Sequence, residues 1–109
     1  MNIQYKDWDA SLDFASYVGN ENTALQLIDN DSKESITVAT VNIGVRKPKD
    51  VLMIKSWSEN TGIVEELIRE EVIQPKPVST HASGFVQVNA YKLTDKAEAV
   101  RQQQYKKRN

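Results

Sequence analysis

One stretch, residues 51–73, constrains the fold more than any other part of the chain. It begins with four consecutive apolar residues, Val51 to Ile54. A short, unbroken apolar run of this kind predicts a strand that is covered on both faces, because an exposed face would carry polar side chains at alternate positions.

A helix is predicted to follow this strand over residues 61–73. Ile63, Leu67 and Val72 recur at helical spacing and form an apolar stripe, whereas the glutamates between them fall outside it. Asn60 or Thr61 is expected to cap the helix by accepting a hydrogen bond from an unpaired N–H of its first turn. The stripe has to be buried, so we expect the helix to pack on a sheet that contains the 51–54 strand.

The rest of the chain reads mainly as strands. Period-two alternation or β-branched content predicts strands near residues 11–18, 23–28, 36–43 and 84–93. A helix through Trp8, Leu12 and Ala15 is an open alternative to the first of them. The pattern predicts an α+β fold, with a mostly antiparallel sheet of about five strands and one main helix on one face.

The length of 109 residues fits one domain. We expect residues 1–10 to be a loosely structured lead-in, residues 11–94 to form the α+β domain, and residues 95–109 to be a basic tail that is partly helical or disordered.

Charge and composition limit the classes of function. The formal net charge is −1 and the chain has no cysteine, which excludes disulfides, thiolate metal sites and a cysteine nucleophile. Residues 95–109 carry 5 basic and 2 acidic side chains on an otherwise acidic chain, unlike the basic stripe of a strong nucleic-acid binder. No apolar run has transmembrane length and no signal peptide is apparent, so we expect a cytoplasmic protein without membrane contact.

The sequence gives little support for catalysis or for a bound cofactor. His81, the only histidine, lies near Ser79 and Ser83, but no strand–elbow–helix motif surrounds these serines. The segment from Asp29 to Glu34 resembles the start of a calcium loop but lacks the glycine that such a loop requires. We therefore expect a protein that is not an enzyme and holds no metal or cofactor.

Two surfaces are candidates for binding. An acidic helix face next to an aromatic residue could contact a protein, or imitate DNA and occupy a basic channel. The candidate protein-binding residues are Trp57, Glu59, Glu65, Glu66, Arg69, Glu70 and Glu71. A basic loop and the tail could instead contact nucleic acid, through Arg46, Lys47, Lys49, Lys106, Lys107 and Arg108.

Several segments together resemble a known family. They are Thr23-Ala-Leu-Gln-Leu, Ala39-Thr-Val-Asn-Ile, Lys55 to Gly62, and Ser83-Gly-Phe-Val. They are similar to a family of small bacterial proteins of unknown function, frequent on plasmids, phages and conjugative elements. The likeness spans roughly residues 11–94, and its most specific parts are the Ser-Glu-Asn-x-Gly turn and the Ser-Gly-Phe-Val segment. This chain departs from the family in having Trp57 and a longer basic tail.

The resemblance supplies a context and no catalytic residues. It implies an accessory protein of a mobile element in a bacterial cell. Many such accessory proteins oppose host defence. The leading hypothesis is a non-enzymatic inhibitor, monomeric or a small homo-oligomer, that binds a protein of a nuclease-based defence such as CRISPR–Cas. The alternative is a nucleic-acid-associated regulatory protein that uses the loop at 46–49 and the tail.

Overall fold

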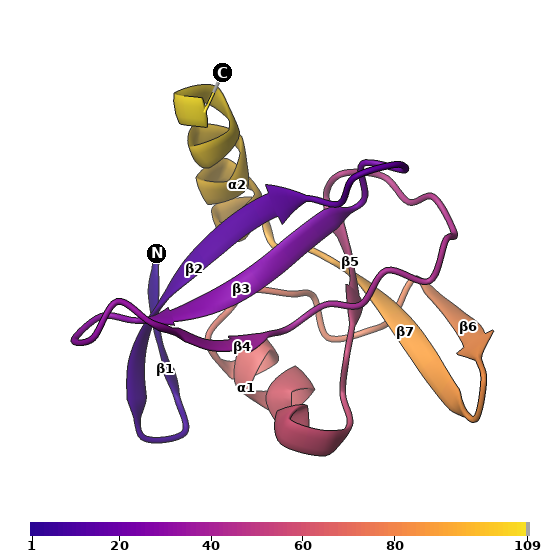
Figure 1. The fold of residues 1–109 in the computed structure, drawn as a ribbon, viewed down its shortest axis with the longest axis horizontal. Coiled ribbons are helices and arrows are strands. Elements are labelled where there is room, and N and C mark those ends of the chain that lie inside the picture. The colour runs from indigo at the N-terminus through magenta and orange to yellow at the C-terminus, as the bar shows by residue number, and fades with distance from the viewer. Residues whose placement is uncertain (109) are drawn as a thin grey trace.

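The computed structural model describes residues 1–108, which form two antiparallel sheets and two α-helices (Figure 1). The larger sheet has the strand order β1-β2-β3-β4 and the smaller has the order β5-β7-β6. The elements are β1 Asn2–Tyr5, β2 Trp8–Ser16, β3 Thr23–Asp29, β4 Ser35–Val38, β5 Val51–Ile54, α1 Ile63–Arg69, β6 Ser79–Ser83, β7 Val86–Lys92 and α2 Asp95–Arg108. The predicted α+β class is confirmed, but the strands form a four-stranded and a three-stranded sheet in place of one sheet of about five.

The first difference from the expected fold is at the N-terminus. Residues 1–10, expected to be a loose lead-in, contain β1 and the start of β2. Ile3 and Tyr5 alternate with exposed residues and are almost completely buried. β2 therefore begins at Trp8, before the predicted position, and the strand interpretation of this segment is correct while the helix alternative is not.

The two sheets meet at Ala39. Its N–H donates to the Leu25 carbonyl of β3 at 2.8 Å, and its carbonyl accepts from the Lys55 N–H at 2.8 Å. Thr40 and Ile54 form an antiparallel bridge beside this point. The predicted 36–43 strand thus ends as β4 at Val38, because from Ala39 onward the chain pairs with β5.

β5 lies between two hydrophobic clusters, as its unbroken apolar sequence predicts. Leu52 and Ile54 belong to the larger cluster, together with Ile63 and Leu67 of α1. Val51 and Met53 belong to a smaller cluster with Val88 and Ala90 of β7, and Val41, Ile43 and Trp57 pack against it. All four β5 side chains are buried, so the prediction that both faces are covered is confirmed.

The turn before α1 differs from the predicted cap. The helix begins at Ile63, its N-cap is Gly62 with φ +88°, and no side chain caps it. Asn60, fully buried, instead binds β4: its Nδ2 donates to the Val38 carbonyl at 2.9 Å, and its Oδ1 accepts from the Thr37 hydroxyl at 2.5 Å. Asn60 therefore ties the turn to the edge of the larger sheet.

The last predicted strand, residues 84–93, is found as β7, whereas the proline-marked loop before it contains a further strand, β6. Ser83 pairs with Val86, so Gly84 and Phe85 form a two-residue hairpin loop. Gly84 has φ +60°, the left-handed value that a glycine at the first position of a II′ turn adopts without strain.

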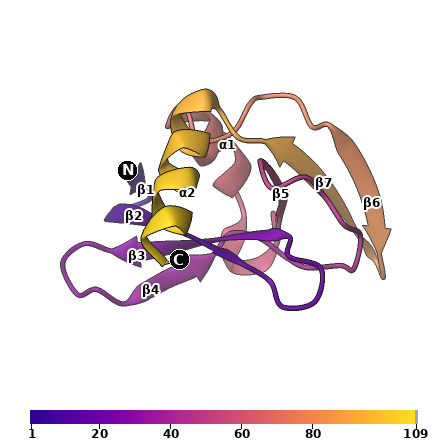
Figure 2. The same cartoon turned by 90° about the horizontal axis from the view of Figure 1, so that it is seen from above.

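α2 is a continuous helix of 14 residues, where a frayed tail was expected. It starts where predicted, because the Thr94 hydroxyl accepts from the Ala97 N–H at 3.2 Å. Asn109, the last residue of the predicted tail, lies outside the described residues. β1 pairs with β2 only as far as Ser11, and α2 covers the next part of the same strand edge (Figure 2).

The contact between α2 and β2 is made by a polar side chain. Gln104 Oε1 accepts from the Phe14 N–H at 2.7 Å, and its Nε2 donates to the Leu12 carbonyl at 2.8 Å. The amide of one side chain thus takes the place that a neighbouring strand would take. Arg108 adds bonds to the Phe14 carbonyl and to the Asp13 carboxylate.

Candidate interaction surface

The acidic face of α1 is largely engaged within the chain. Glu66 pairs with Arg69, whose Nη2 also donates to the Gln4 carbonyl at 3.0 Å. Glu70 accepts from the Gln4 N–H at 2.5 Å. These bonds attach the C-terminal end of α1 to the backbone of β1, so Arg69 and Glu70 stabilise the fold.

α1 ends at Arg69, before the predicted end at residue 73, so Glu70 and Glu71 follow the helix. Glu71 lies 3.5 Å from Lys96 Nζ. Glu65 is exposed and, among residues 1–108, has neither an ion pair nor a side-chain hydrogen bond. The predicted acidic face is therefore partly neutralised by Arg69 and Lys96, and Glu65 is its one free carboxylate within the described chain.

Trp57 and Glu59 lie elsewhere, beside an open groove of about 730 Å³ between β4 and the segment after β5. We call it the β4 groove. It is lined by apolar parts of Tyr17, Ile36, Val38, Val41 and Trp57, with Lys55 and Glu59 also contributing. Trp57 is half-buried and packs against the smaller cluster, while Val38 is 43% exposed. The structure thus separates two of the predicted protein-binding residues from the glutamates of α1.

Two polar contacts define the β4 groove. The Tyr17 hydroxyl lies 2.9 Å from the Thr40 hydroxyl, and Lys55 Nζ lies 2.5 Å from Glu59 Oε1. The hydrogen bond from Lys55 lowers the pKa of the exposed Glu59 carboxyl below its ordinary value. At neutral pH the groove therefore has an apolar lining, and its rim carries the charges of Lys55 and Glu59, which pair with each other.

Sequence analysis missed Tyr17, Ile36, Val38 and Val41 as site residues. Ile36, Val38 and Val41 fall in the predicted 36–43 strand, and Tyr17 in the predicted 11–18 strand, neither with a surface role. The available signal is that the apolar residues 36 and 38 have one parity and the apolar residues 41 and 43 the other, so they change face near Ala39. This change of face leaves apolar side chains on both sides of a strand that is at the edge of its sheet.

The structure brings the predicted basic loop and the C-terminal basic segment together. Lys49 Nζ lies 5.6 Å from the centroid of the Tyr105 ring on α2. Arg46 and Lys49 are 4.0 and 3.9 Å from Glu21, and Arg108 pairs with Asp13. Lys106 and Lys107 are exposed and form no ion pair within residues 1–108.

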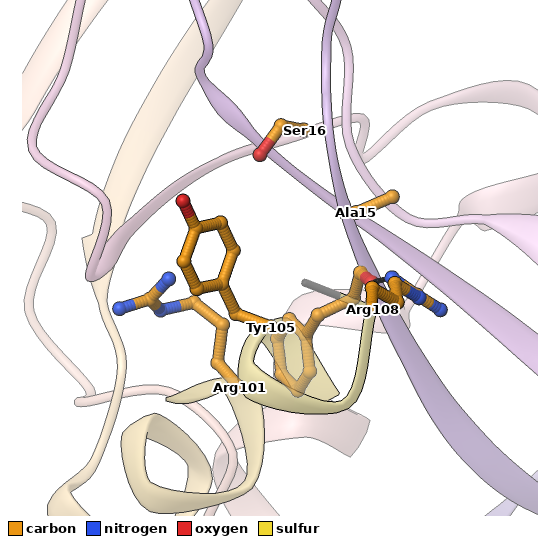
Figure 3. A pocket seen from close by; sticks show the side chains of 6 residues that line it. Ala15, Ser16, Arg101, Tyr105 and Arg108 are labelled. Carbon is orange, nitrogen blue, oxygen red and sulfur yellow. Dashed lines mark hydrogen bonds between the residues drawn. The ribbon is translucent and has the colours of Figure 1, made fainter. Parts of the chain in front are cut away.

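A smaller groove of about 230 Å³ lies between α2 and β2. Figure 3 shows Arg101 and Tyr105 side by side on α2, with Ser16 across the groove. Arg101 donates to both carboxylate oxygens of Glu98, at 2.5 and 2.9 Å. These bonds lower the pKa of the Glu98 carboxyl and raise the pKa of Arg101, so the groove is close to electrically neutral.

Three polar side chains, those of Ser79, His81 and Lys47, meet at the start of β6. Ser79 Oγ is 3.0 Å from His81 Nε2 and 2.9 Å from Lys47 Nζ. The sequence pointed to Ser79 and His81 but not to Lys47, which is distant in the chain. Within residues 1–108 no carboxylate pairs with His81 to orient its ring, which nucleophilic catalysis of the serine–histidine type requires.

Residues 1–108 contain no group of three or more histidine, cysteine or acidic side chains arranged to hold a metal ion. None of their helices combines the length and apolar character that crossing a membrane requires.

Comparison with protein-family models gives no match for this chain, and comparisons with curated proteins and with solved structures give none either. The resemblance to a mobile-element family therefore stays a hypothesis.

Proposed function

We propose that this chain is a non-enzymatic protein-binding factor whose contact surface is the β4 groove. The supporting observation is the lining of that groove, in which Trp57 and Tyr17 stand beside the exposed Val38. Tryptophan and tyrosine dominate the binding energy of protein interfaces, and an apolar centre with a polar rim is their usual arrangement. The paired Lys55 and Glu59 supply such a rim.

The biological role follows from the resemblance alone. We propose an accessory protein of a mobile genetic element that works in the bacterial cytoplasm. Its target would be a protein of a nuclease-based defence such as a CRISPR effector. Binding would inhibit that protein by covering a surface that the protein needs for its activity. The internal pairing of Glu66, Glu70 and Glu71 argues against DNA imitation by α1 as the main mode of binding.

The test is affinity capture of the tagged full chain from bacterial host lysate, with and without nuclease treatment. We expect one protein partner that survives nuclease. Trp57→Ala should weaken the purified interaction about 30-fold, close to 2 kcal/mol, because a central aromatic anchor is lost.

Two further variants guard this test against loss of folding. Val38→Glu places a charge in the β4 groove at an exposed position and should also weaken binding, whereas Glu65→Ala on α1 should leave the affinity unchanged. Equal affinity of the wild type, Trp57→Ala and Val38→Glu would reject the β4 groove as the contact surface.

A second candidate function is binding of single-stranded nucleic acid. The observation that favours it is the position of Lys49 over Tyr105, which unites the two basic segments beside an aromatic ring. With about four phosphate contacts, affinity for a single-stranded oligonucleotide should fall roughly 50-fold between about 50 and 200 mM salt. Fluorescence anisotropy of a labelled oligonucleotide measures this affinity. An affinity that does not change with salt concentration would reject the candidate.

A further inference from the structure

The tip of the β6–β7 hairpin carries a phenylalanine with no contacts to the rest of the protein. Phe85 has a relative exposure of 108%, the largest among the exposed large hydrophobic residues of the described chain. Single exposed aliphatic residues are common on protein surfaces, but a completely exposed aromatic ring is an unusual use of a residue that gains so much from burial.

The hairpin presents this ring at a distance from the body of the molecule. Figures 1 and 2 both show β6 and β7 at the opposite side from β1 and α2. Val88 and Ala90, farther down β7, are fully buried and anchor the hairpin in the smaller cluster. The two-residue turn at Gly84 fixes the backbone at Phe85, so the backbone of this segment has little conformational freedom to lose on binding.

The charge around the ring restricts the partner. Residues 79–91 contain no lysine, arginine, aspartate or glutamate. A nucleic-acid partner would be contacted through cations that pair with phosphates, and an anionic membrane would attract the same cations. An uncharged projection with an aromatic tip is instead suited to an apolar pocket of a protein, where charged residues are depleted.

We propose that Phe85 is an anchor that inserts into an apolar pocket on the protein partner. The hydroxyl of Ser83 and the amide of Gln87, on either side of the turn, are placed to bond the polar rim of that pocket. This inference rests on the proposed protein-binding function and adds a second point of contact, separate from the β4 groove.

The test is site-specific photo-crosslinking of the full chain in bacterial cells. The photoreactive residue p-benzoylphenylalanine replaces Phe85, Val38 in the β4 groove, or the exposed Ala99 on α2 as control. We expect one protein crosslinked from position 85 and none from position 99. Phe85 touches nothing within the protein, so its replacement should leave the circular dichroism spectrum and the unfolding midpoint unchanged.

The outcomes separate the two proposals. A protein crosslinked from position 38 but not from position 85 overturns the role of Phe85 and leaves the proposed function standing. No protein crosslinked from either position overturns both. Crosslinks from position 85 to nucleic acid, to lipid or to a second copy of this chain also overturn the inference.

An affinity measurement complements the crosslinks. Phe85→Ser should weaken binding to the captured partner tenfold or more, the range of an interface anchor. Val18→Ser is the matched control, because Val18 is also completely exposed in a loop between two strands. Equal affinity of Phe85→Ser and the wild type contradicts the inference.

Discussion

Removal of α2 by ending the chain at Thr94 is expected to lower the free energy of unfolding by about 4 kcal/mol or more, a large share of the 5–15 kcal/mol typical of a whole domain. Ala97 is fully buried and Val100 packs against the larger cluster. The edge of β2 beyond Ser11 would also lose the two hydrogen bonds of the Gln104 amide and would become exposed to water. Urea unfolding monitored by circular dichroism measures the loss.

Point variants show whether the effect comes from the contact with β2. Gln104→Ala should cost about 1–2 kcal/mol, since it removes two hydrogen bonds to backbone groups. Gln103→Ala, on the exposed side of the same helix, should cost a few tenths at most. A truncated chain as stable as the wild type would show that α2 is dispensable and would contradict this account of the fold.

Replacement of Asn60 by alanine is expected to destabilise the protein by about 3 kcal/mol. The change removes the bonds to Thr37 and to the Val38 carbonyl from a site with 0% exposure. Removing one partner of a hydrogen bond away from bulk water costs roughly 1–3 kcal/mol, and this substitution breaks two such bonds, both partly buried. Because β4 would lose its tie to the turn, the β4 groove should also change shape, and Trp57 fluorescence should report it.

Two variants sharpen the Asn60 prediction. Thr61→Ala, at the exposed neighbouring position, should cost less than about 1 kcal/mol. In Asn60→Asp the new side chain can donate to the Val38 carbonyl only while its carboxyl is protonated, and burial would raise the pKa of that carboxyl. That variant should therefore be most stable at acid pH and lose stability as the pH rises through the raised pKa. A mild effect of Asn60→Ala would reject the role assigned to this side chain.

The fold was predictable where local pattern and burial agree. β3, β5 and β7 alternate, or stay apolar, in the way their burial requires, and the structure contains all three. β1 was missed because only Ile3 and Tyr5 mark its buried face in a short, polar segment. The strand β6 was missed because Ser79, His81 and Ser83 are small or polar on its half-buried face.

The placement of α2 and of Asn60 could not be predicted from hydrophobic periodicity. The apolar residues of α2 are too few to predict a docked helix, and the helix depends instead on Gln104 and Arg108 bonding to the backbone of β2. Asn60 has the right position and chemistry for a helix cap, yet its amide pairs with β4, 22 residues away. Long-range polar pairing of this kind has no periodic signature in the sequence.

The candidate surface was predictable only in part. Trp57 and Glu59 were identified, but the β4 groove depends on the chain leaving β3 after Ala39 to pair with β5, which a strand pattern does not reveal. Helical spacing predicted one acidic helix face with Glu65, Glu66, Glu70 and Glu71, but α1 ends at Arg69, so Glu70 and Glu71 lie beyond it. The contacts of Glu66, Glu70 and Glu71 with Arg69, the backbone of β1 and Lys96 follow from tertiary structure.

Hydrogen–deuterium exchange on the complex between this chain and its captured partner tests the central claim most directly. We predict that added partner slows exchange in residues 36–42 and 55–59, which border the β4 groove, and at the tip of the β6–β7 hairpin. Protection confined to α1 or to residues 101–108, with residues 36–42 and 55–59 exchanging as in the free protein, would contradict it.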